Sequence, residues 1–454
     1  MAETLETAAT VDPPAVPPTG TPAGTPTPEV AVKSVPAPAP ARASAPLAAA
    51  RRRVGGLLLA AAGLLAVGGC ASDAELDTFA PQGPIAEELH SRAVMPVIWI
   101  AAVVFVGIGV ALGLLIWRNR VKSYAGDDEW PSQTHGHIPL EVGWTVGFFV
   151  TMAAVAGLML WSLPTVNATE DNAMVVEIDG RSVDWEPTVV VVGNQWWWEF
   201  RYYFSDQVDL ADLRRHGDAK TLPPADIVTS GQMVIPTGEE VELIVTSRDV
   251  IHSFWIPALN GKRDAVPNRF SPWKIQASAP GFYFGQCTEF CGLSHSRMRM
   301  QTVALDPADF QAWVDDTSLD AVAPVDPEAL AGQEVFSGIC TSCHVVEGLN
   351  DDVFERADQA SGAAPNLTHF ASRSTFAGGI FDTYNADGSL NRTVLEAWLR
   401  NPGELKANYI VPGEQYRGMP DLDLSEAQID QLVAYLAGLG AKPAGWIIDA
   451  TRVE

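Results

Sequence analysis

The stretch CTEFCGLSHSRM, residues 287–298, holds two cysteines four positions apart, a histidine four further on and a methionine three after that. Thiolate, imidazole and thioether form a soft ligand set, which favours copper over hard cations. One short loop that supplies all four groups needs another ligand to close a copper site, and His252, just after a strand-like run, is the candidate. The alternative is a surface loop with a disulfide. The candidate ligands on the stretch are Cys287, Cys291, His295 and Met298.

A second redox motif, Cys340-Thr341-Ser342-Cys343-His344, matches the C-x-x-C-H attachment sequence of c-type haem. In this motif the cysteines form thioethers with the haem and the histidine binds its iron. A haem that transfers electrons needs a second axial ligand, and methionine there raises the potential. Met419 is the predicted ligand, and the competitor His369 is expected to pack near the haem edge. A zinc knuckle or a redox dithiol is the alternative interpretation.

The composition of the 454 residues is globular with membrane-like insertions, which suggests two or three domains. The net charge of −26 argues against nucleic acid as a partner, because phosphate binding needs a basic face. An acidic surface suits solubility and can attract a basic protein partner. Of the five cysteines, four fall in the two motifs and Cys70 stands alone, which is not the pattern of a disulfide framework.

The N-terminal region predicts export. Residues 1–50 are rich in proline, alanine and threonine and are expected to be disordered, because they offer little apolar surface to bury. Residues 51–70 have a basic start, a short apolar run and small residues, which is the pattern of a secretory signal. The end of this segment resembles a bacterial lipobox, with Cys70 as the lipidated N-terminus. The apolar run Val54–Val67 is too short to cross a hydrocarbon core of about 30 Å as an extra span.

Two longer apolar runs predict a transmembrane hairpin within residues 85–170. The spans are Val94–Trp117 and Val142–Leu163, each long enough to cross a bilayer and each with tryptophans toward its ends. A buried helix pair is the alternative. The positive-inside rule places the connecting loop in the cytoplasm and both ends outside, because the loop begins with basic residues. These residues are Arg118, Arg120 and Lys122, and the next one after the second span is Arg181.

Residues 174–314 are predicted to form one all-β domain of the Greek-key type, since short β-rich runs alternate there with glycine, proline, asparagine and aspartate. A short helix, Pro307–Val314, is expected to close it. The expected strands are Met174–Ile178, Thr188–Val192, Trp196–Tyr203, Gln232–Ile235, Val241–Ser247 and Trp273–Ala277.

Residues 315–326 are a predicted linker, and residues 327–442 are predicted to form a helical domain. Ser425 with Gln428 fits a helix N-cap and capping box. The expected helices are Pro327–Phe336, Leu395–Arg400 and Ser425–Leu439. The predicted fold class is therefore multidomain, with a transmembrane helix hairpin, an all-β domain and an all-α domain.

Together, these motifs resemble subunit II of haem–copper cytochrome c oxidases, in the type with a fused C-terminal cytochrome c, over residues 85–440. The resemblance implies a cupredoxin-like fold for the β domain, a cytochrome c fold for the helical domain, and a binuclear CuA centre. It implies that two thiolates bridge the two coppers, that each imidazole terminates one copper, and that a thioether and a backbone carbonyl are weak axial ligands. The bridging thiolates would be those of Cys287 and Cys291, and the terminal imidazoles those of His252 and His295. The axial ligands would be the Met298 thioether and the Glu289 backbone carbonyl. The Glu289 carboxylate would reach a magnesium ion shared with subunit I.

Other matches to this family are less specific. In QWWW, residues 195–198, Trp196 aligns with the tryptophan where external cytochrome c delivers its electron. For Trp197 and Trp198 a place on a half-buried strand is the preferred interpretation. In LEVGWT, residues 140–145, Glu141 matches the glutamate at the entrance of a proton channel into subunit I, although a carboxylate at a membrane edge is otherwise ordinary.

The chain departs from the family pattern at three places. Phe148-Phe149 stands where a proline is usual, which affects the expected geometry of the second span. Asn268 stands where glycine is usual. Asp249 matches an acidic docking position, but its neighbour Arg248 replaces an acid, which weakens docking of a separate basic cytochrome there.

The resemblance implies an electron-accepting subunit of a proton-pumping oxidase in the cell membrane, with both soluble domains on the extracytoplasmic side. Its implied partners are subunit I, which reduces oxygen to water, subunit III, and cytochrome c or another donor. No residue pattern here indicates an acid–base pair or a nucleophile, so the chain's own chemistry is redox relay. Three alternatives are a subunit of a nitric oxide reductase, a quinol oxidase subunit, which would lack the copper ligands, and a copper-delivery or sensor lipoprotein.

Overall fold

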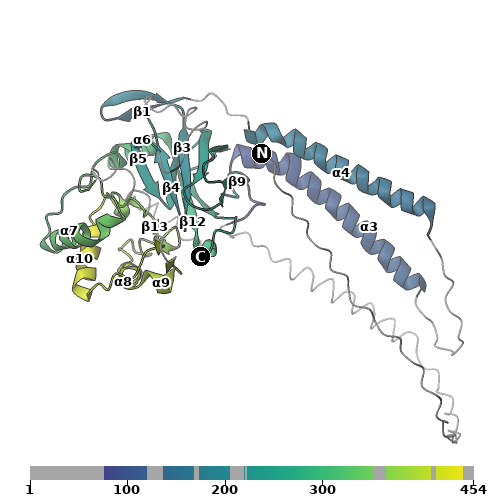
Figure 1. The fold of residues 1–454 in the computed structure, drawn as a ribbon. Helices are drawn as coiled ribbons and strands as arrows, with labels where there is room; N and C mark the ends of the chain where they lie inside the picture. The colour runs from purple at the N-terminus through teal and green to yellow at the C-terminus, as the bar shows by residue number, and fades with distance from the viewer. Residues whose placement is uncertain are drawn as a thin grey trace, which may run out of the picture. The chain divides into compact units, whose positions relative to one another are not determined.

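The structure is a computed structural model that describes residues 76–119, 136–167, 173–204, 219, 222–350, 364–410 and 416–442 (Figure 1). The predicted extension 1–50, the signal segment 51–70 and the lipidated Cys70 lie outside the described residues and stay predictions. The other domain boundaries given above also stay predictions.

Two long apolar helices lie where the membrane spans are expected. A short helix α2 (Pro84–Leu89) and a π-helical turn η1 (His90–Val94) lead into α3 (Met95–Asn119), and α4 (Ile138–Asn167) follows. Both long helices are apolar and long enough to cross a membrane by length and composition. Their large side chains are mostly exposed within the chain, as lipid-facing helices require. Helix α4 continues without a break through Phe148 and Phe149.

The β region consists of two main sheets and two small hairpins (Figure 1). The larger sheet has the order β10-β7-β3-β4-β5, the smaller one β11-β12-β6, and the hairpins are β1-β2 and β8-β9. Each main sheet includes one parallel pair, β3 with β7 and β12 with β6, so the chain crosses between strands rather than meandering. The bounds are β1 (Met174–Ile178), β2 (Arg181–Trp185), β3 (Thr188–Asn194), β4 (Trp197–Tyr202), β5 (Ile227–Ser230), β6 (Gln232–Pro236), β7 (Val241–Ser247), β8 (His252–Trp255), β9 (Lys262–Ala265), β10 (Ser271–Ile275), β11 (Gly281–Gln286) and β12 (Arg299–Leu305).

The central strands are buried on both faces, so they do not alternate between apolar and polar residues. Every residue of β3 and of β4 is buried. Helix α6 (Pro307–Thr317) packs on this core through Phe310 and Val314. The sequence pattern predicted six of these strands, whereas β2, β5, β8, β9, β11 and β12 were not predicted. Several of them are short and polar, as in Lys262–Ala265, and their pairing partners rather than their own pattern define them.

The C-terminal region is helical, with small two-stranded pieces. Helix α7 (Pro327–Ile339) and helix α10 (Glu426–Leu436) lie side by side (Figure 1). The predicted capping box is confirmed, because the Ser425 hydroxyl accepts from the Gln428 amide N–H and the Gln428 side chain bonds back to Ser425. The remaining elements are α8 (Arg392–Arg400), α9 (Pro402–Leu405), η4 (Cys340–Ser342), η6 (Phe370–Ser372), β13 (Thr375–Phe376), β14 (Phe381–Asp382), β15 (Tyr409–Ile410) and β16 (Tyr416–Arg417).

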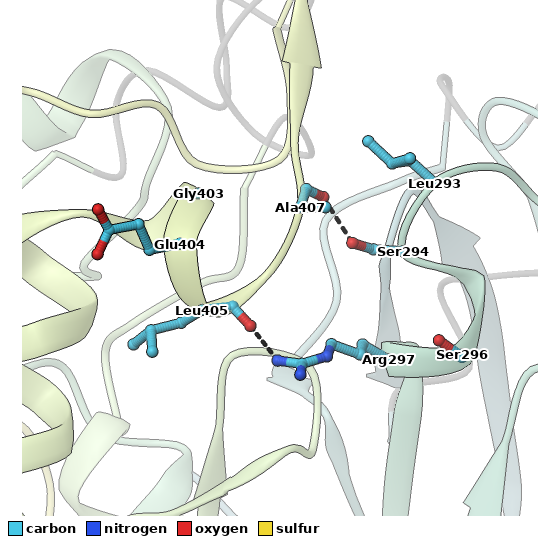
Figure 2. A pocket seen from close by; sticks show the side chains of 8 residues that line it. All are labelled: Leu293, Ser294, Ser296, Arg297, Gly403, Glu404, Leu405 and Ala407. Carbon is cyan, nitrogen blue, oxygen red and sulfur yellow. Dashed lines mark hydrogen bonds between the residues drawn. The ribbon is translucent and has the colours of Figure 1, made fainter.

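We call residues 174–314 the β module and residues 327–442 the helical module. They have separate hydrophobic cores, yet they touch where α9 and the chain after it meet the loop that follows β11. There the Arg297 guanidinium donates to the Leu405 carbonyl, and the Ser294 hydroxyl donates to the Ala407 carbonyl at 2.5 Å (Figure 2). These contacts line a small pocket and join the loop of residues 287–298 to the helical module.

Candidate metal centre

The soft side chains predicted to act together come from two places in the β module. His252 is the first residue of β8, and the others lie on the loop between β11 and β12, which includes the short helix η3 (His295–Arg297). The antiparallel pairing of β11 with β12 closes this loop into one compact turn. Cys287, Cys291 and Met298 are buried members of the main hydrophobic core. The loop is therefore anchored in the core and held rigidly.

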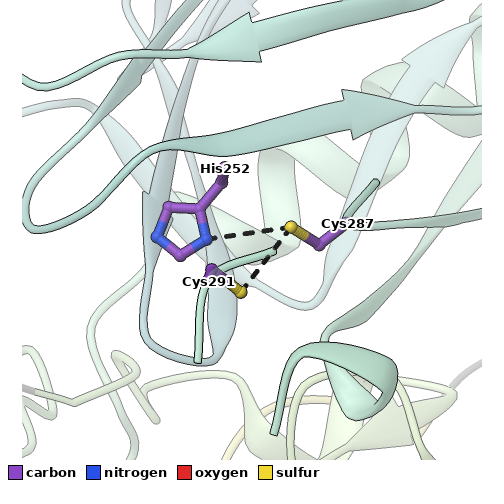
Figure 3. A group of neighbouring side chains, drawn as sticks. All are labelled: His252, Cys287 and Cys291. Atoms are coloured by element: carbon purple, nitrogen blue, oxygen red, sulfur yellow. Dashed lines mark hydrogen bonds between the residues drawn. The ribbon is translucent and has the colours of Figure 1, made fainter. Parts of the chain in front are cut away.

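The two cysteines face each other and His252 without a disulfide. Both are free thiols, with their sulfurs 3.8 Å apart (Figure 3). The Nδ1 atom of His252 lies 3.8 Å from the Cys287 sulfur, and the ligand atoms of all three residues lie within 4.8 Å of one another. A metal–thiolate bond is about 2.3 Å, so two sulfurs at this separation can share a metal. The disulfide alternative is not what the structure contains.

The other predicted ligands surround the same sulfurs. The Nδ1 atom of His295 lies 3.5 Å and the Met298 thioether sulfur 3.8 Å from the Cys291 sulfur. On the other side, the Cys287 sulfur lies 3.2 Å from the backbone carbonyl oxygen of Glu289. Each sulfur therefore has one imidazole and one weak donor beside it. This donor set is chemically suited to copper.

Asp249 orients the imidazole of His252. Its carboxylate Oδ1 lies 2.8 Å from the His252 Nε2 atom, which leaves Nδ1 to face the sulfurs. The carboxylate also accepts from the Gln195 and Val250 backbone N–H groups. A carboxylate bonded to the outer nitrogen of a ligand histidine fixes its tautomer and ring orientation. The sequence comparison had suggested a docking position for Asp249, but its side chain is only 9% exposed and turned onto a histidine of its own chain.

Packing also fixes the His252 ring. The Trp198 ring lies edge to face with it at a centroid distance of 5.9 Å, which gives this strand tryptophan a direct contact with the site. Gly193 lies behind the ring, where an added Cβ would come within 2.8 Å of the imidazole. Neither contact could be found from residue spacing, since β8 lies outside the sheet of β3 and β4 and meets these strands only in the folded module.

In the metal-free site, the hydrogen bonds and charges favour the thiolate form of Cys287 over that of Cys291. The hydrogen bond from Cys291 lowers the pKa of Cys287 to about 4, while the contact with Cys287 and burial raise the pKa of Cys291. Burial lowers the pKa of His252, but Asp249 and Cys287 outweigh it and the net shift is upward. Since cysteine binds metals as thiolate and histidine as the neutral ring, metal binding must release protons here.

The aromatic segment before β4 is bonded to the same loop. The Trp196 indole N–H donates to the Cys291 carbonyl at 3.0 Å, and the Gln195 side-chain amide donates to the same oxygen at 2.6 Å. Trp196 is only 2% exposed. The part played by Gln195 was not predicted, because a glutamine next to three tryptophans carries no signal of its own. Trp196 is thus one hydrogen bond from the peptide of a candidate metal ligand.

The C-x-x-C-H motif begins in the core of the helical module, where Cys340 is buried. Cys340 and Cys343 are free thiols at the end of α7, and burial raises the pKa of Cys340 to about 11. The Nδ1 atom of His344 lies 2.7 Å from the Pro365 carbonyl, and burial lowers the pKa of the ring to about 4. A neutral ring that donates from Nδ1 leaves Nε2 free as a ligand. This geometry fits the proximal histidine of a haem.

The two candidates for the second axial position differ in their contacts. Met419 is partly buried and packs against the same core cluster that contains Cys340. His369 is buried, and its Nε2 atom lies 3.0 Å from the Leu319 carbonyl in the linker. This hydrogen bond gives the His369 ring a structural partner outside the motif.

Glu141 lies at the beginning of α4. Its carboxylate accepts from the His137 backbone N–H at 2.9 Å, which satisfies one of the unpaired donors of the first helical turn. This contact is a structural reason for an acid at the position. It also places the carboxylate at the end of a candidate membrane span.

Two protein families match successive parts of the chain. Residues 187–304 match the periplasmic domain of cytochrome c oxidase subunit II, and residues 329–440 match cytochrome c. These are the parts that hold the thiol–imidazole cluster and the C-x-x-C-H motif. The two domains imply copper and haem c as cofactors.

Two named relatives are similar in sequence to most of this chain. Cytochrome c oxidase subunit 2 of Alkalihalophilus pseudofirmus is 31% identical over 376 residues, or 82% of this chain and 93% of the relative. The subunit 2 of Bacillus subtilis is 30% identical over 395 residues, or 85% and 97%. The solved periplasmic domain of oxidase subunit II from Bradyrhizobium japonicum is 29% identical, with a TM-score of 0.22, over 28% of this chain and 91% of that one.

The match to these relatives spans the helix pair, the β module and the helical module together. The chain therefore belongs to the cytochrome c oxidase subunit II family, as a membrane-bound oxidase subunit that has a periplasmic domain and a cytochrome c domain and transfers electrons together with the other oxidase subunits.

Proposed function

We propose that this chain accepts electrons from a cytochrome c at its own covalent haem and relays them to a two-copper centre. From there they pass to subunit I, which reduces oxygen to water and pumps protons. The observation that carries the proposal is the pair of thiols 3.8 Å apart, each with an imidazole and a weak donor beside it. Subunit III is a further proposed partner, and Cys70 is proposed as a lipid anchor.

In this proposal the two thiolates, the two imidazoles, the thioether and the backbone carbonyl would together hold two copper ions. When bound, the copper pair supplies a one-electron couple at a site whose shape changes little. The protein's part is to hold the ligands: β11 and β12 close the loop, while Asp249 and Trp198 fix the ring of His252. Such preorganisation keeps reorganisation small during electron transfer. The residues concerned are Cys287, Cys291, His252, His295, Met298 and Glu289.

In the helical module, the proposal is that Cys340 and Cys343 bind haem c covalently and that His344 and Met419 are its axial ligands. The Glu289 side chain is exposed on the free chain, which supports its proposed carboxylate contact with magnesium at the boundary with subunit I. Glu141, at the start of α4, is proposed as the entrance of a proton channel in subunit I.

Metal and haem analysis of the full chain, purified with its partner subunits, tests the proposal. We expect two coppers in this chain and one covalent haem that stays attached after denaturation. Zinc in place of copper, or haem released by denaturation, would contradict it. Parallel assays with oxygen and with nitric oxide separate an oxidase from a nitric oxide reductase.

Replacing Met298 with leucine should preserve both coppers but change the reduction potential of the centre. Met298 is fully buried with its sulfur 3.8 Å from that of Cys291, so leucine fills the space and removes only a weak donor. Redox titration followed by the copper absorption gives the potential. Met300→Leu on β12 is the matched control and should leave it unchanged. An unchanged potential in the Met298 variant would exclude its ligation.

Replacing Met419 with leucine should leave the haem covalently bound but remove the absorption band characteristic of methionine-ligated ferric haem. The thioethers and His344 do not depend on this side chain, whereas the sixth ligand does. The absorption spectrum of the oxidised protein is the measurement. His369→Gln should keep the band. The reverse result, with the band kept in the Met419 variant and lost in the His369 variant, would assign the axial position to His369.

A further inference from the structure

Side chains of the helical module cover the Trp196 indole. The Tyr409 ring lies 5.7 Å from it between centroids, and Tyr409, although it belongs to the helical module, packs against the hydrophobic core of the β module. Gly418, the residue before Met419, is so close that an added Cβ would lie 3.6 Å from the indole. The chain itself thus occupies the face of Trp196 that an external cytochrome would otherwise touch.

A buried lysine joins the two modules at this point. Lys406 of the helical module is 8% exposed, and its Nζ donates to the Trp196 carbonyl at 2.6 Å and to the Ala377 carbonyl at 2.7 Å. Gly378 makes room for it with a φ of 78°, since an added Cβ would lie 2.5 Å from Nζ. A buried amine is costly unless it is hydrogen-bonded, so these two carbonyls determine where it lies.

The short segment from Lys406 to Tyr409 also holds the loop of the proposed axial ligand. The side-chain amide of Asn408 donates to the Met419 carbonyl, while Tyr409 lies on Trp196. One segment of four residues therefore bonds to the backbone of Trp196 on one side and to that of Met419 on the other. In turn, Trp196 donates to the carbonyl of Cys291.

We propose that Lys406 is a positioning residue for electron transfer within the chain, because it fastens the helical module to the β module with the Trp196 indole between the haem loop and the copper loop. The inference rests on the proposed function, since it assumes that both redox centres are loaded. It also assigns a separate cytochrome c to the helical module as its docking partner. Trp196 then acts as an internal relay rather than as an external contact.

The contact does not depend on one protonation state. Burial lowers the pKa of Lys406 to about 7. The ammonium and the neutral amine both carry enough protons to donate to two carbonyls. Both bonds are therefore available on either side of neutral pH.

Two backbone amides report directly on the contact between the modules. The Arg299 N–H donates across it to the Gly378 carbonyl at 3.0 Å, and the Ser374 N–H donates to the side-chain oxygen of Gln232 at 2.9 Å. Hydrogen–deuterium exchange of such amides measures how often the contact opens. This readout requires neither copper nor haem, so it can be interpreted even if the proposed function fails.

The test compares Lys406→Met with Lys442→Met in the full chain purified with its partner subunits. Lys442 is exposed, and its Nζ lies over the Tyr384 ring of its own module, so it is a matched control. We expect the peptides that contain Arg299 and Ser374 to exchange about 10- to 100-fold faster in the Lys406 variant, as the loss of a buried charge-assisted bond predicts. Peptides from β3 should be unchanged. Lys406→Gln, which keeps a shorter donor, should give an intermediate effect.

The second measurement is electron transfer from haem to copper after rapid reduction of the haem, with copper and haem contents determined on the same samples. In the Lys406 variants, electron transfer from haem to copper should slow in proportion to the fraction of molecules in which the two modules are separated. In Lys442→Met it should stay unchanged. Unchanged exchange at Arg299 and Ser374 would overturn the fastening role. Faster exchange with unchanged transfer in fully loaded protein would overturn the electron-transfer role. Missing copper or haem in the unaltered chain would instead count against the proposed function.

Discussion

Replacing Cys291 with serine is expected to abolish the proposed two-copper centre, and with it the proposed electron transfer to subunit I, while leaving the fold and the proposed covalent haem in place. The Cys291 sulfur contacts the Cys287 sulfur, the His295 ring and the Met298 thioether, so its loss removes three contacts of the site at once. A hydroxyl is a hard, weakly acidic ligand that cannot replace a bridging thiolate. The Cys291 carbonyl keeps its bonds to Gln195 and Trp196, which preserves the local backbone.

The measurements for this variant are copper content and the copper absorption spectrum. The matched control is Cys343→Ser, which removes a cysteine from the haem motif and should alter haem attachment but not copper. Retention of both coppers with an unchanged spectrum in Cys291→Ser would remove Cys291 from the bridging role.

Replacing Asp249 with asparagine should weaken copper binding about 10- to 100-fold, as is typical when the partner of a ligand histidine is lost. Asparagine has nearly the same shape, but it has a single acceptor oxygen and no charge, whereas the carboxylate accepts from His252, Val250 and Gln195. The Nε2–H of His252 would lose its carboxylate partner, so the tautomer that leaves Nδ1 free to bind metal would be held less firmly. The prediction is thus a loss of affinity without a loss of fold.

Copper affinity is measured by competition with a chelator, and thermal unfolding of the same samples checks that the fold is intact. Asp264→Asn on β9 is the matched control, because this carboxylate is exposed on the same hairpin and makes no contact with His252 that the described residues show. Equal affinity in the Asp249 variant and the unaltered chain would mean that the ring is held by packing against Trp198 and Gly193 alone.

Much of the fold was predictable because it depends on patterns local in sequence. The spans follow from long apolar runs, and the capping box at Ser425 is a local hydrogen-bond pattern that the structure reproduces. The paired order of the strands was not predictable. The central strands β3 and β4 were predicted, but because both of their faces are buried their sequences do not indicate which strand lies beside them. The hairpin strands β8 and β9 are defined by each other.

The sequence by itself determined the ligand types and their spacing on the loop, because Cys287, Cys291, His295 and Met298 lie within one turn of chain, and it determined the haem motif at Cys340–His344. Only the tertiary structure decided which neighbours act on them. Asp249 faces His252, Gln195 and Trp196 share the Cys291 carbonyl, and Lys406 reaches Trp196 from a point 210 positions along the chain. The physical reason is that these contacts form between strands and modules that are far apart in the sequence and meet only on folding. An aspartate, a glutamine or a lysine carries no signal in the sequence that shows which side chain or carbonyl it will contact.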